Sequence, residues 1–553
     1  MTCTAACSPD ELQRLLRPRS DVVVEELDPS APGSTDSAEA PVDVPAPEAV
    51  FRAIDGPFAH YRRTVHILER HDEESVVRQH ISYRLSVPVW GWFMTPLANR
   101  ELRRPRSDGT QPFWAPAERL DPRAGQVLGV LCLLSVVAGY LGTLLSQTIT
   151  FAFDEFDAGL ATQGNTLTAV RVGVLLALAL VALADRRGRR PMLLFAAVAG
   201  CVVAAAGAAS TGVWTYGTSQ MISRSLSTAM FVLLLVVAAE EVPAGARAYA
   251  VSVLTLSAGL GSGMVVWLLP LADLGLRAWR ILFLAPLLAL PLVLFCARRL
   301  PESRRFAPSE AAGRDASNVV AARAGRPGVS DRRRRRARRL LLLGCGALLF
   351  SLFAAPASQF LNEFLRSERS FSAGNISVFQ LSINTPAAIG VLIGGRFSDI
   401  RGRRRIGAFG LAAGAAFTVL RYVEGGWPMW MWGVLASIFG AASVPVMGAF
   451  GAELFGTSNR AGSNGLITVM GVIGSMIGLQ IVGRFTDAGG EFGHVFAMIA
   501  GAPVLVALLI LFAFPETAWR ELEDLNPEDV AAGDVGSEDV GPGDQGACPP
   551  PPG

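Results

Sequence analysis

The amino-acid sequence predicts an all-α membrane protein with about twelve transmembrane helices in two six-helix repeats, preceded by a small N-terminal cytoplasmic module. Three observations lead to this fold class. Hydrophobic residues make up 51% of the 553 residues, and the mean hydropathy of +0.38 is too high for a protein whose surface faces water. The apolar residues fall in runs of roughly 20, the length that crosses a bilayer. Landmarks of the first six runs return in the last six at constant spacing.

The chain before the first apolar run is polar and falls into two parts. Residues 1–50 are rich in Pro, Ala, Ser, Asp and Glu, a composition that predicts disorder. Residues 51–122 predict a cytoplasmic module, because alternating apolar residues on both sides of Arg70–Glu74 are typical of a β-hairpin. Within this module, Val87–Leu97 is too short to span a bilayer and carries two tryptophans. It predicts docking at the membrane surface, with packing inside the module as the alternative.

Apolar runs divide the rest of the chain into two halves, residues 123–300 and residues 340–520. A basic cytoplasmic linker, residues 301–339, separates the halves, and the polar tail, residues 521–553, predicts disorder. The runs of the first half are Val127–Ile149, Leu167–Ala184, Pro191–Ser210, Met221–Ala239, Ala250–Leu269 and Ile281–Ala297. Those of the second half are Leu340–Phe360, Val378–Ile393, Ile406–Leu420, Trp430–Phe450, Leu466–Val482 and Val495–Phe514.

Arginines predict the orientation of these helices. The connections after the second and eighth runs are rich in arginine, and so is the central linker, whereas the alternate connections are poor in it. The positive-inside rule places the arginine-rich side, with both chain termini, in the cytoplasm of a multi-pass inner-membrane protein. The arginines of the linker anchor this topology, with contact to anionic lipids as the alternative. The polar, acidic N-terminus does not resemble a secretory signal.

Three landmarks indicate an internal duplication. Asp185-Arg-Arg-Gly-Arg-Arg returns as Asp399-Ile-Arg-Gly-Arg-Arg. Glu240, with an arginine at 247, returns as Glu453, with an arginine at 460. Pro-Glu-Ser at 301–303 returns as Pro-Glu-Thr at 515–517. The offset between the copies is the same for all three landmarks to within a single position, which is the pattern of a repeated transporter unit.

These motifs resemble those of the major facilitator superfamily. Residues 395–404, Gly-Arg-Phe-Ser-Asp-Ile-Arg-Gly-Arg-Arg, are similar to the family's loop motif, and Arg224 matches its arginine in the fourth helix. Trp279-Arg280 and the later Pro-Glu-Ser resemble the sixth helix of the sugar-porter and metabolite-symporter branch. The resemblance implies secondary transport of a small organic solute by alternating access. Gly-Tyr-Leu at 139–141, where sugar porters tend to have Gly-Tyr-Asp, argues against a sugar.

The resemblance also implies a cytoplasmic latch of ion pairs that holds the outward-facing conformation and breaks as the halves rock. Topological anchoring is the alternative for these charges. The gating candidates are Asp185, Arg186, Arg190, Glu240, Arg247, Asp399, Arg403, Glu453 and Arg460.

Two arginines fall deep inside predicted spans and suggest the class of substrate. Arg171 and Arg224 lie roughly 21–22 Å from the cytoplasmic ends of their helices, where a charge is costly unless it meets a partner or a wet cavity. Because arginine binds carboxylate and phosphate well, we expect an anionic metabolite. Structural pairing of either arginine remains the alternative. Polar residues expected to line the cavity, or to join helices, are Gln147, Gln359, Asn362, Gln380 and Asn384.

Proton coupling requires a group that titrates, and the predicted spans hold no carboxylate near their centres. Asp154, Glu155 and Glu363 at the periplasmic edge are therefore the coupling candidates, although each is also explained as a loop charge. Uncoupled transport stays open.

Other functions are less well supported by the sequence. An enzyme is not expected, because there is no nucleophile elbow, phosphate-binding loop, cofactor motif or metal spacing. Gly259, Gly261 and Gly263 allow close helix packing but do not match the pattern of drug antiporters. Multidrug efflux is the alternative within transport, and a non-transporting membrane sensor is the alternative outside it. The expected partners are a small-molecule substrate, the lipid bilayer and, if coupled, protons; nucleic acid is not expected, and the chain is expected to be a monomer.

The arginine asymmetry gives a testable topology. Reporter fusions after Asp157 should report a periplasmic position, and fusions after Arg190 or within Arg332–Arg339 a cytoplasmic one, because the positive-inside rule retains arginine-rich loops. A cytoplasmic signal after Asp157 would invert the orientation.

Overall fold

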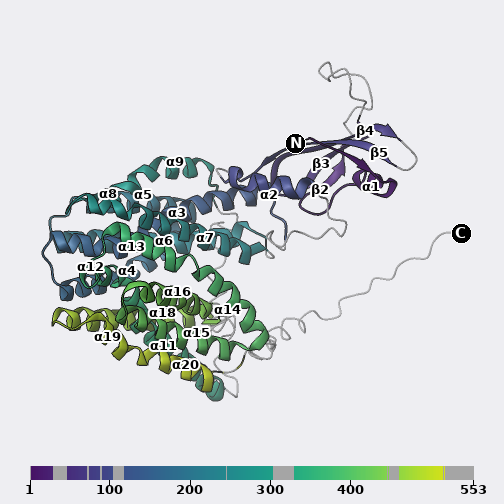
Figure 1. Ribbon diagram of the computed structural model, residues 1–553. Coiled ribbons are helices and arrows are strands. Elements are labelled where there is room, and N and C mark those ends of the chain that lie inside the picture. Colours follow the sequence, from purple (N-terminus) through teal and green to yellow (C-terminus); the bar gives the residue numbers. More distant parts are fainter. Residues whose placement is uncertain are drawn as a thin grey trace.

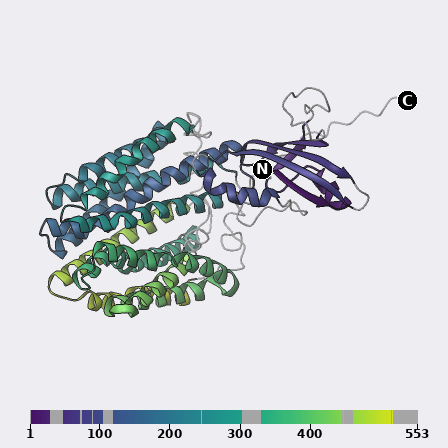
Figure 2. The ribbon, with the colours of Figure 1, turned by 45° about the horizontal axis from the view of Figure 1, so that its top comes forward.

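The computed structural model describes residues 2–28, 47–70, 74–87, 90–103, 118–243, 246–302, 329–444, 446–447, 460–514 and 516. A strand-rich module projects from one end of a bundle of helices, and the two halves of the bundle lie side by side (Figure 1, Figure 2). We call the end that carries the module the module end of the bundle, and the opposite end the far end.

The module is built on a five-stranded antiparallel sheet with strand order β1-β5-β4-β3-β2. The two long strands β4 and β5 form the hairpin that the alternating pattern predicts, and the short helix α1 follows β1. The strands are β1 Thr2–Cys7, β2 Val24–Leu27, β3 Ala49–Asp55, β4 Phe58–Arg70 and β5 Ser75–Leu85, and α1 is Pro9–Leu15.

The expectation of disorder over residues 1–50 is wrong for residues 2–27, which contain β1, α1 and β2, and for residues 49–50, which begin β3. The residues that give this region its Pro- and Ala-rich composition are concentrated between 29 and 46, outside the described residues. The flanking strands are short, and their pairing with distant strands leaves no local pattern in the sequence.

Helices α1 and α2, the latter spanning Gly91–Arg103, cover one face of the sheet. The alternation of apolar and polar residues along the strands predicts such a half-buried sheet. Leu12 of α1 packs against Val65 and Val77, and Leu102 packs against Tyr61 and Ile81. Leu102 lies near the end of helix α2.

Helix α2 overlaps the segment predicted to dock at the membrane surface. Its last turns pack in the module, since Ala98 and Leu102 are buried, whereas Trp92 is 75% exposed. The indole of Trp90, just before α2, donates a hydrogen bond of 3.3 Å to the carbonyl of Gly129 in the bundle.

Buried ion pairs join the loops of the module to its sheet. The carboxylate of Glu25 accepts hydrogen bonds from Arg63 and from the hydroxyl of Tyr61, and burial raises the pKa of that phenol. The guanidinium of Arg19 pairs with Asp21 and also donates to carbonyl groups of α2. Because uncompensated buried charges are costly, these contacts fix α2 against the sheet.

The first half of the bundle contains six spans; a short 3-10 turn, η2, ends the fifth span and another, η3, interrupts the sixth. These elements are α3 Pro122–Glu155, α4 Leu160–Arg187, α5 Arg189–Gly207, α6 Val213–Glu241, α7 Arg247–Leu268, η2 Leu269–Leu274, α8 Arg280–Leu284, η3 Ala285–Ala289 and α9 Leu290–Arg299.

The second half repeats this arrangement. Its elements are α11 Val329–Gln359, α12 Leu361–Ser367, α13 Ala373–Asn384, α14 Ala387–Arg401, α15 Arg403–Val423, α16 Gly426–Ala442, α18 Arg460–Asp487, α19 Phe492–Ile499 and α20 Gly501–Phe512. Helix α11 begins at Val329, so part of the segment predicted as linker, including its arginine run, belongs to the first turns of a helix.

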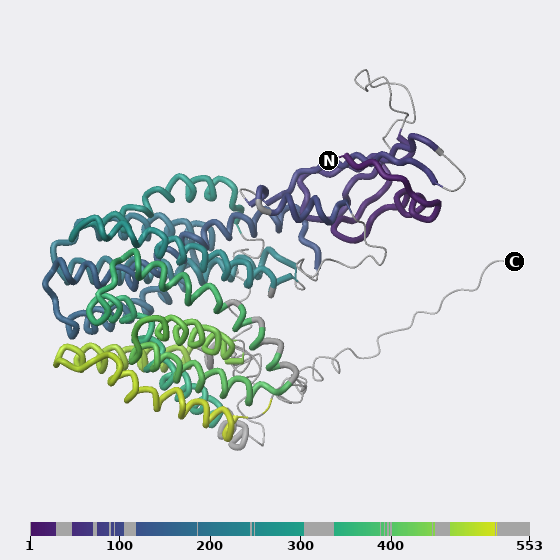
Figure 3. The backbone as a smooth tube through the Cα atoms, viewed as in Figure 1, coloured from purple at the N-terminus to yellow at the C-terminus, as the bar shows by residue number. Residues whose placement is uncertain are grey.

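Ten segments of the described chain are long and apolar enough to cross a membrane. Helices α13 and α14, separated by Thr385 and Pro386, and the 17-residue α16 occupy the other two of the twelve positions expected from the sequence. Figure 3 follows the chain through the first half and then through the second.

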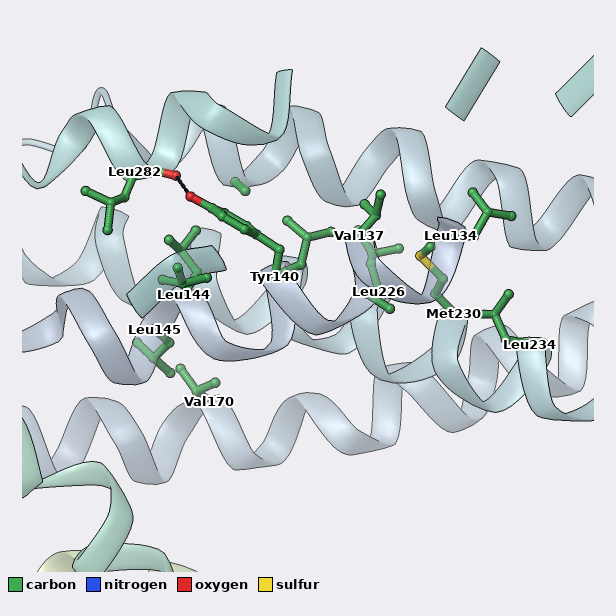
Figure 4. Close-up of a cluster of buried hydrophobic side chains, with 14 of the residues drawn as sticks. Leu134, Val137, Tyr140, Leu144, Leu145, Val170, Leu226, Met230, Leu234 and Leu282 are labelled. Carbon is green, nitrogen blue, oxygen red and sulfur yellow. Dashed lines mark hydrogen bonds between the residues drawn. The ribbon is translucent and has the colours of Figure 1, made fainter. Parts of the chain in front are cut away.

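Helix α3 lies at the centre of the first half, where most of its length is buried. Figure 4 shows Tyr140 among apolar side chains of α3, α4 and α6, including Leu144, Val170 and Leu226. The hydroxyl of Tyr140 donates a hydrogen bond of 2.8 Å to the carbonyl of Leu282, which satisfies its polar group in this apolar environment.

Glycines allow two equivalent helix pairs to pack in direct backbone contact. A Cβ atom on Gly261 of α7 would lie 1.9 Å from the carbonyl oxygen of Val136 in α3. A Cβ atom on Gly474 of α18 would lie 2.0 Å from the carbonyl oxygen of Leu348 in α11. The two glycines are separated along the chain by the same offset as the duplicated landmarks. Of the three glycines singled out in α7, only Gly261 lies in such a contact, since Gly259 and Gly263 face open space.

Candidate functional site

A cavity of about 500 Å³ lies between the two halves of the bundle. Helices α3 and α6 of the first half line it, together with α11, α12, α13, α15, α16 and α20 of the second. Its described polar lining residues are Thr143, Ser146, Gln147, Arg224, Ser358, Gln359, Gln380, Asn384, Thr418, Arg421 and Ser437.

Two arginines enter this lining, one from each half. Arg224 of α6 is half-buried and donates a hydrogen bond of 2.7 Å to the carbonyl of Gly142. Arg421, near the end of α15, is only 7% exposed and donates a hydrogen bond of 3.3 Å to the carbonyl of Ala357, while its Nε has no hydrogen-bond partner. Arg421 was not predicted as a site residue from the sequence, because it follows an apolar run as an anchoring arginine would.

No acidic side chain is among the described residues that line the cavity, so its fixed charge there is positive. Arg171, predicted to contact the substrate, is not among these lining residues. It lies in α4, close enough to Arg224 for the two charges to repel one another.

Three buried amide side chains join the halves over the cavity. Gln147 of α3 exchanges hydrogen bonds with Gln380 of α13, at 2.8 and 3.1 Å, and accepts one of 3.0 Å from Asn362 of α12. The amide of Gln380 also donates to Asn362. Asn362 does not line the cavity, but it is hydrogen-bonded to Gln147 and Gln380, which do. Gln359 and Asn384, also selected from the sequence, line the cavity directly, and Oε1 of Gln359 has no hydrogen-bond partner.

Further contacts between the halves lie toward the far end. The carboxylate of Asp154 pairs with Arg366 at 2.5 Å. Asp273 accepts hydrogen bonds of 2.7 and 2.8 Å from the backbone amides of Ala373 and Gly374 at the start of α13, where the helix dipole favours a carboxylate. Together with the amides, these contacts close the far side of the cavity.

The three coupling candidates have different environments. Asp154 is engaged with Arg366, and Glu155 accepts hydrogen bonds of 2.8 Å from both Arg280 and the indole of Trp279. Glu363 of α12 lies beyond the apolar span Ala337–Gln359 and is half-buried. Burial, with the charge of Asp154 as a smaller contribution, raises the pKa of the Glu363 carboxyl to about 7.

Two carboxylates cap equivalent helices at the duplicated loops. Glu302 accepts hydrogen bonds of 3.2 Å from the backbone amides of Arg189 and Arg190, which begin α5. Glu516 accepts hydrogen bonds of 2.9 and 3.3 Å from the first two amides of α15. Such amides are unsatisfied within the helix and carry partial positive charge.

The glycine between the paired helices makes each cap possible. Gly188 and Gly402 adopt φ values of 99° and 97°, which favour glycine. A Cβ atom on Gly402 would lie 2.9 Å from a carboxylate oxygen of Glu516. The Pro-Glu repeat was a sequence landmark of the duplication, but its capping role was not predicted.

The gating candidates lie in different environments. Glu240 pairs with Arg189 at 3.0 Å, and Arg190 donates a hydrogen bond of 2.8 Å to the carbonyl of Ala297. Arg186 is exposed, Arg247 is half-buried with an Nε that lacks a hydrogen-bond partner, and Arg403 gives its backbone amide to Glu516. The side chains of Asp185, Asp399 and Arg460, and all of Glu453, lie outside the described residues.

A sequence model of the Major Facilitator Superfamily matches residues 127–387 and 340–529. The chain belongs to the major facilitator superfamily. Its membership confirms the resemblance found in the sequence and establishes a multi-pass transporter with two six-helix repeats. No curated protein sequence matches the chain.

Solved structures show the same major facilitator fold. The inward-open xylose transporter XylE from E. coli is 17% identical, with a TM-score of 0.58 over 73% of this chain and 99% of that one. The nucleoside transporter NupG is 13% identical, with a TM-score of 0.54 over 70% of this chain and 100% of that one. An inward-facing, unoccupied bacterial homolog of the human lysosomal transporter Spinster is 14% identical, with a TM-score of 0.53 over 70% and 95%.

The two caps of this major facilitator protein should stabilise it independently. Glu516→Gln keeps an acceptor for the amides of α15 but removes the charge, so we expect a loss of about 1 kcal/mol and a lower melting temperature of the purified protein. Glu302→Gln should have a similar effect, and the double variant the sum of both. Glu424→Gln, at the exposed other end of α15, is the control. An unchanged melting temperature in the double variant would show that the caps do not contribute.

Proposed function

We propose that this transporter is a secondary active transporter that carries a small organic anion across the cell inner membrane by alternating access. The observation that carries the proposal is the pair of arginines, Arg224 and Arg421, in a cavity whose described lining holds no acid. A buried cation is costly unless it gains a partner, and a bound anion would supply one to both arginines.

The polarity of the cavity fits a solute of this class. The guanidinium group presents donors in a planar fork that matches a carboxylate or a phosphate. The Nε of Arg421 and the Oε1 of Gln359 have no hydrogen-bond partner in the protein, which leaves a donor and an acceptor for a ligand. The same positive charge disfavours lipophilic cations, so we do not favour multidrug efflux.

We further propose that the module end is cytoplasmic and that the structure is the inward-facing conformation. The described contacts that cross the cavity, from Gln147 to Asp154 and Asp273, lie on its far side. Opening to the periplasm would break these contacts, while the capped loops stay within their own halves. Opening would also have to separate α4 from α18, which pack closely at the far end: a Cβ atom on Gly164 would lie 2.8 Å from the carbonyl oxygen of Leu479.

The charge of the substrate can be tested with the purified protein. A panel of carboxylates and sugar phosphates, compared with neutral and cationic compounds, should raise the melting temperature only where the compound is anionic. Arg224→Gln and Arg421→Gln should each weaken binding of such an anion by roughly ten- to a hundredfold, because each loses a charge-assisted hydrogen bond worth about 1.5–3 kcal/mol.

Arg171→Gln is the matched control, since Arg171 is a membrane arginine outside the described lining. It should change affinity far less than the other two variants. A stabilising compound that is neutral or cationic, with the same affinity in Arg224→Gln and Arg421→Gln, would contradict the proposal.

We also propose that Glu363 is the proton-coupling group. Its folded-state pKa of about 7 lies above the ordinary value, so the folded protein gains a proton, and stability, as pH falls. Between pH 8 and pH 6 this gain should be about 1 kcal/mol, seen as a rise in the melting temperature, and Glu363→Gln should lack it. Glu368→Gln is a control from the following turn. An equal rise in Glu363→Gln would assign the proton to another group.

A further inference from the structure

One face of the module's sheet is basic and is not covered by α1 or α2. Beyond the register shift that follows Phe58, the even-numbered residues from His60 to His66 on β4 and from Val76 to Arg84 on β5 point away from both helices, and the basic residues among them are exposed or half-exposed. Arg52 of β3, opposite Arg62, lies on the same face. We call this the basic sheet face; its basic residues are Arg52, His60, Arg62, His66, Arg78, His80 and Arg84.

The register brings these side chains close together. His60 lies opposite Arg84, His66 opposite Arg78, and Arg52 opposite Arg62. Directly opposed residues have Cβ atoms roughly 4.5–5.5 Å apart, and like charges at that distance destabilise a sheet. Arg52 and Arg62 are directly opposed, and Arg78 and Arg84 lie on the same face, so the face presents positive charge that attracts an anionic partner.

Few acids offset this charge among the described residues. Glu26 of β2 pairs with Arg52, and the buried pairs of Glu25 and Asp21 lie on the covered side. None of the ion pairs described for the module includes Arg62, Arg78 or Arg84.

The direction of the strands makes a lipid surface a poor partner. The strands extend away from the bundle, beyond the start of α3, in both Figure 1 and Figure 2. Because α3 crosses the membrane, most of the sheet projects away from the headgroups. The partner is then a soluble anion on the module's side of the membrane.

The chain itself offers a polyanion at that side. Helix α20 ends at the module end of the bundle, where α3 begins (Figure 1, Figure 3). From residue 521 to residue 544 the sequence contains no basic residue. Its nine acids are Glu521, Glu523, Asp524, Glu528, Asp529, Asp534, Glu538, Asp539 and Asp544.

The chain is long enough to bring these acids to the module. An extended chain covers about 3.3–3.6 Å per residue, so the residues from 516 to 544 can reach roughly 100 Å. Covalent linkage over such a length gives an effective concentration on the order of millimolar, at which even weak charge pairing is populated.

We propose that the acidic segment 521–544 binds the basic sheet face of the module. Arg119 and Trp90 fix the module to the first half of the bundle, through carbonyls of Asp21 and Gly129, and α20 carries the acidic segment from the second half. The contact therefore connects the module, which is held to the first half, with the segment that follows α20 of the second half. It does not depend on which solute the transporter carries.

Binding of a fluorescent peptide with the sequence of residues 519–546 tests this contact. The peptide should bind a chain that ends at residue 516, in a neutral detergent at low salt, with an affinity that falls at least tenfold when salt is raised to about 0.5 M. The full-length chain should bind the peptide at least tenfold more weakly, because its own segment occupies the face. Equal binding to the two chains, or no binding to either at low salt, would overturn the proposal.

Matched charge reversals locate the site. Arg62→Glu with Arg84→Glu should weaken peptide binding to the shortened chain at least tenfold. Arg14→Glu with Arg17→Glu changes the net charge equally but alters exposed arginines on the side of α1, and should leave binding within about twofold. Gel filtration and melting temperature identify any variant that is misfolded, and Arg62→Gln with Arg84→Gln is the milder replacement. Equal loss in both pairs would overturn the assignment to this face.

Vesicles distinguish a membrane partner. The shortened chain in neutral nanodiscs should show no gain in binding to added phosphatidylglycerol vesicles over phosphatidylcholine vesicles that depends on Arg62 and Arg84. Such a gain, without peptide binding, would overturn the proposal and assign the face to anionic lipid.

Discussion

The three hydrogen-bonded amides of Gln147, Asn362 and Gln380 are the contact on which the rest of the site depends. They come from both halves and meet in a buried position, where an amide that lost its partners would cost about 1–3 kcal/mol. While they hold together, the far side is closed and the side chains below them enclose a cavity. The ion pair of Asp154 with Arg366 is more exposed and adds less, so the closed conformation rests mainly on neutral groups.

Charge is distributed differently in the cavity and at the loops. In the cavity, Arg224 and Arg421 have carbonyl oxygens as partners and no described carboxylate, so the protein compensates their charge incompletely. At the duplicated loops, Glu302 and Glu516 each accept hydrogen bonds from two helix amides. Incompletely compensated arginines suit a cavity that must bind and release an ion. Fully hydrogen-bonded caps suit loops that must keep their shape through the transport cycle.

The sequence alone predicted the fold class well and the site in part. Runs of roughly 20 apolar residues and the repeated Asp-x-x-Gly-Arg-Arg are local patterns, so they predicted the spans and the two halves. The amides at 147, 359, 380 and 384 were selected because polar residues are rare in apolar runs. Arg421 was missed because its role depends on which end of α15 faces the other half, a tertiary property. The capping by Glu516 joins parts of the chain far apart in sequence, and the strands β1 and β2 pair with distant partners, so no local window contains either signal.

The glycine contacts of α3 with α7 and of α11 with α18 have a mechanical consequence. Helices in van der Waals contact along their backbones cannot slide or roll past one another without collision, because no side chain between them can change rotamer to make room. Each pair should therefore move as one rigid unit that spans the bilayer. A small displacement of α3 near Gln147 must carry the loop before α7 with it, about 30 Å away by helix length. Rigidity at the duplicated glycines, more than flexibility elsewhere, would convert a movement at the ligand into one at the membrane surface.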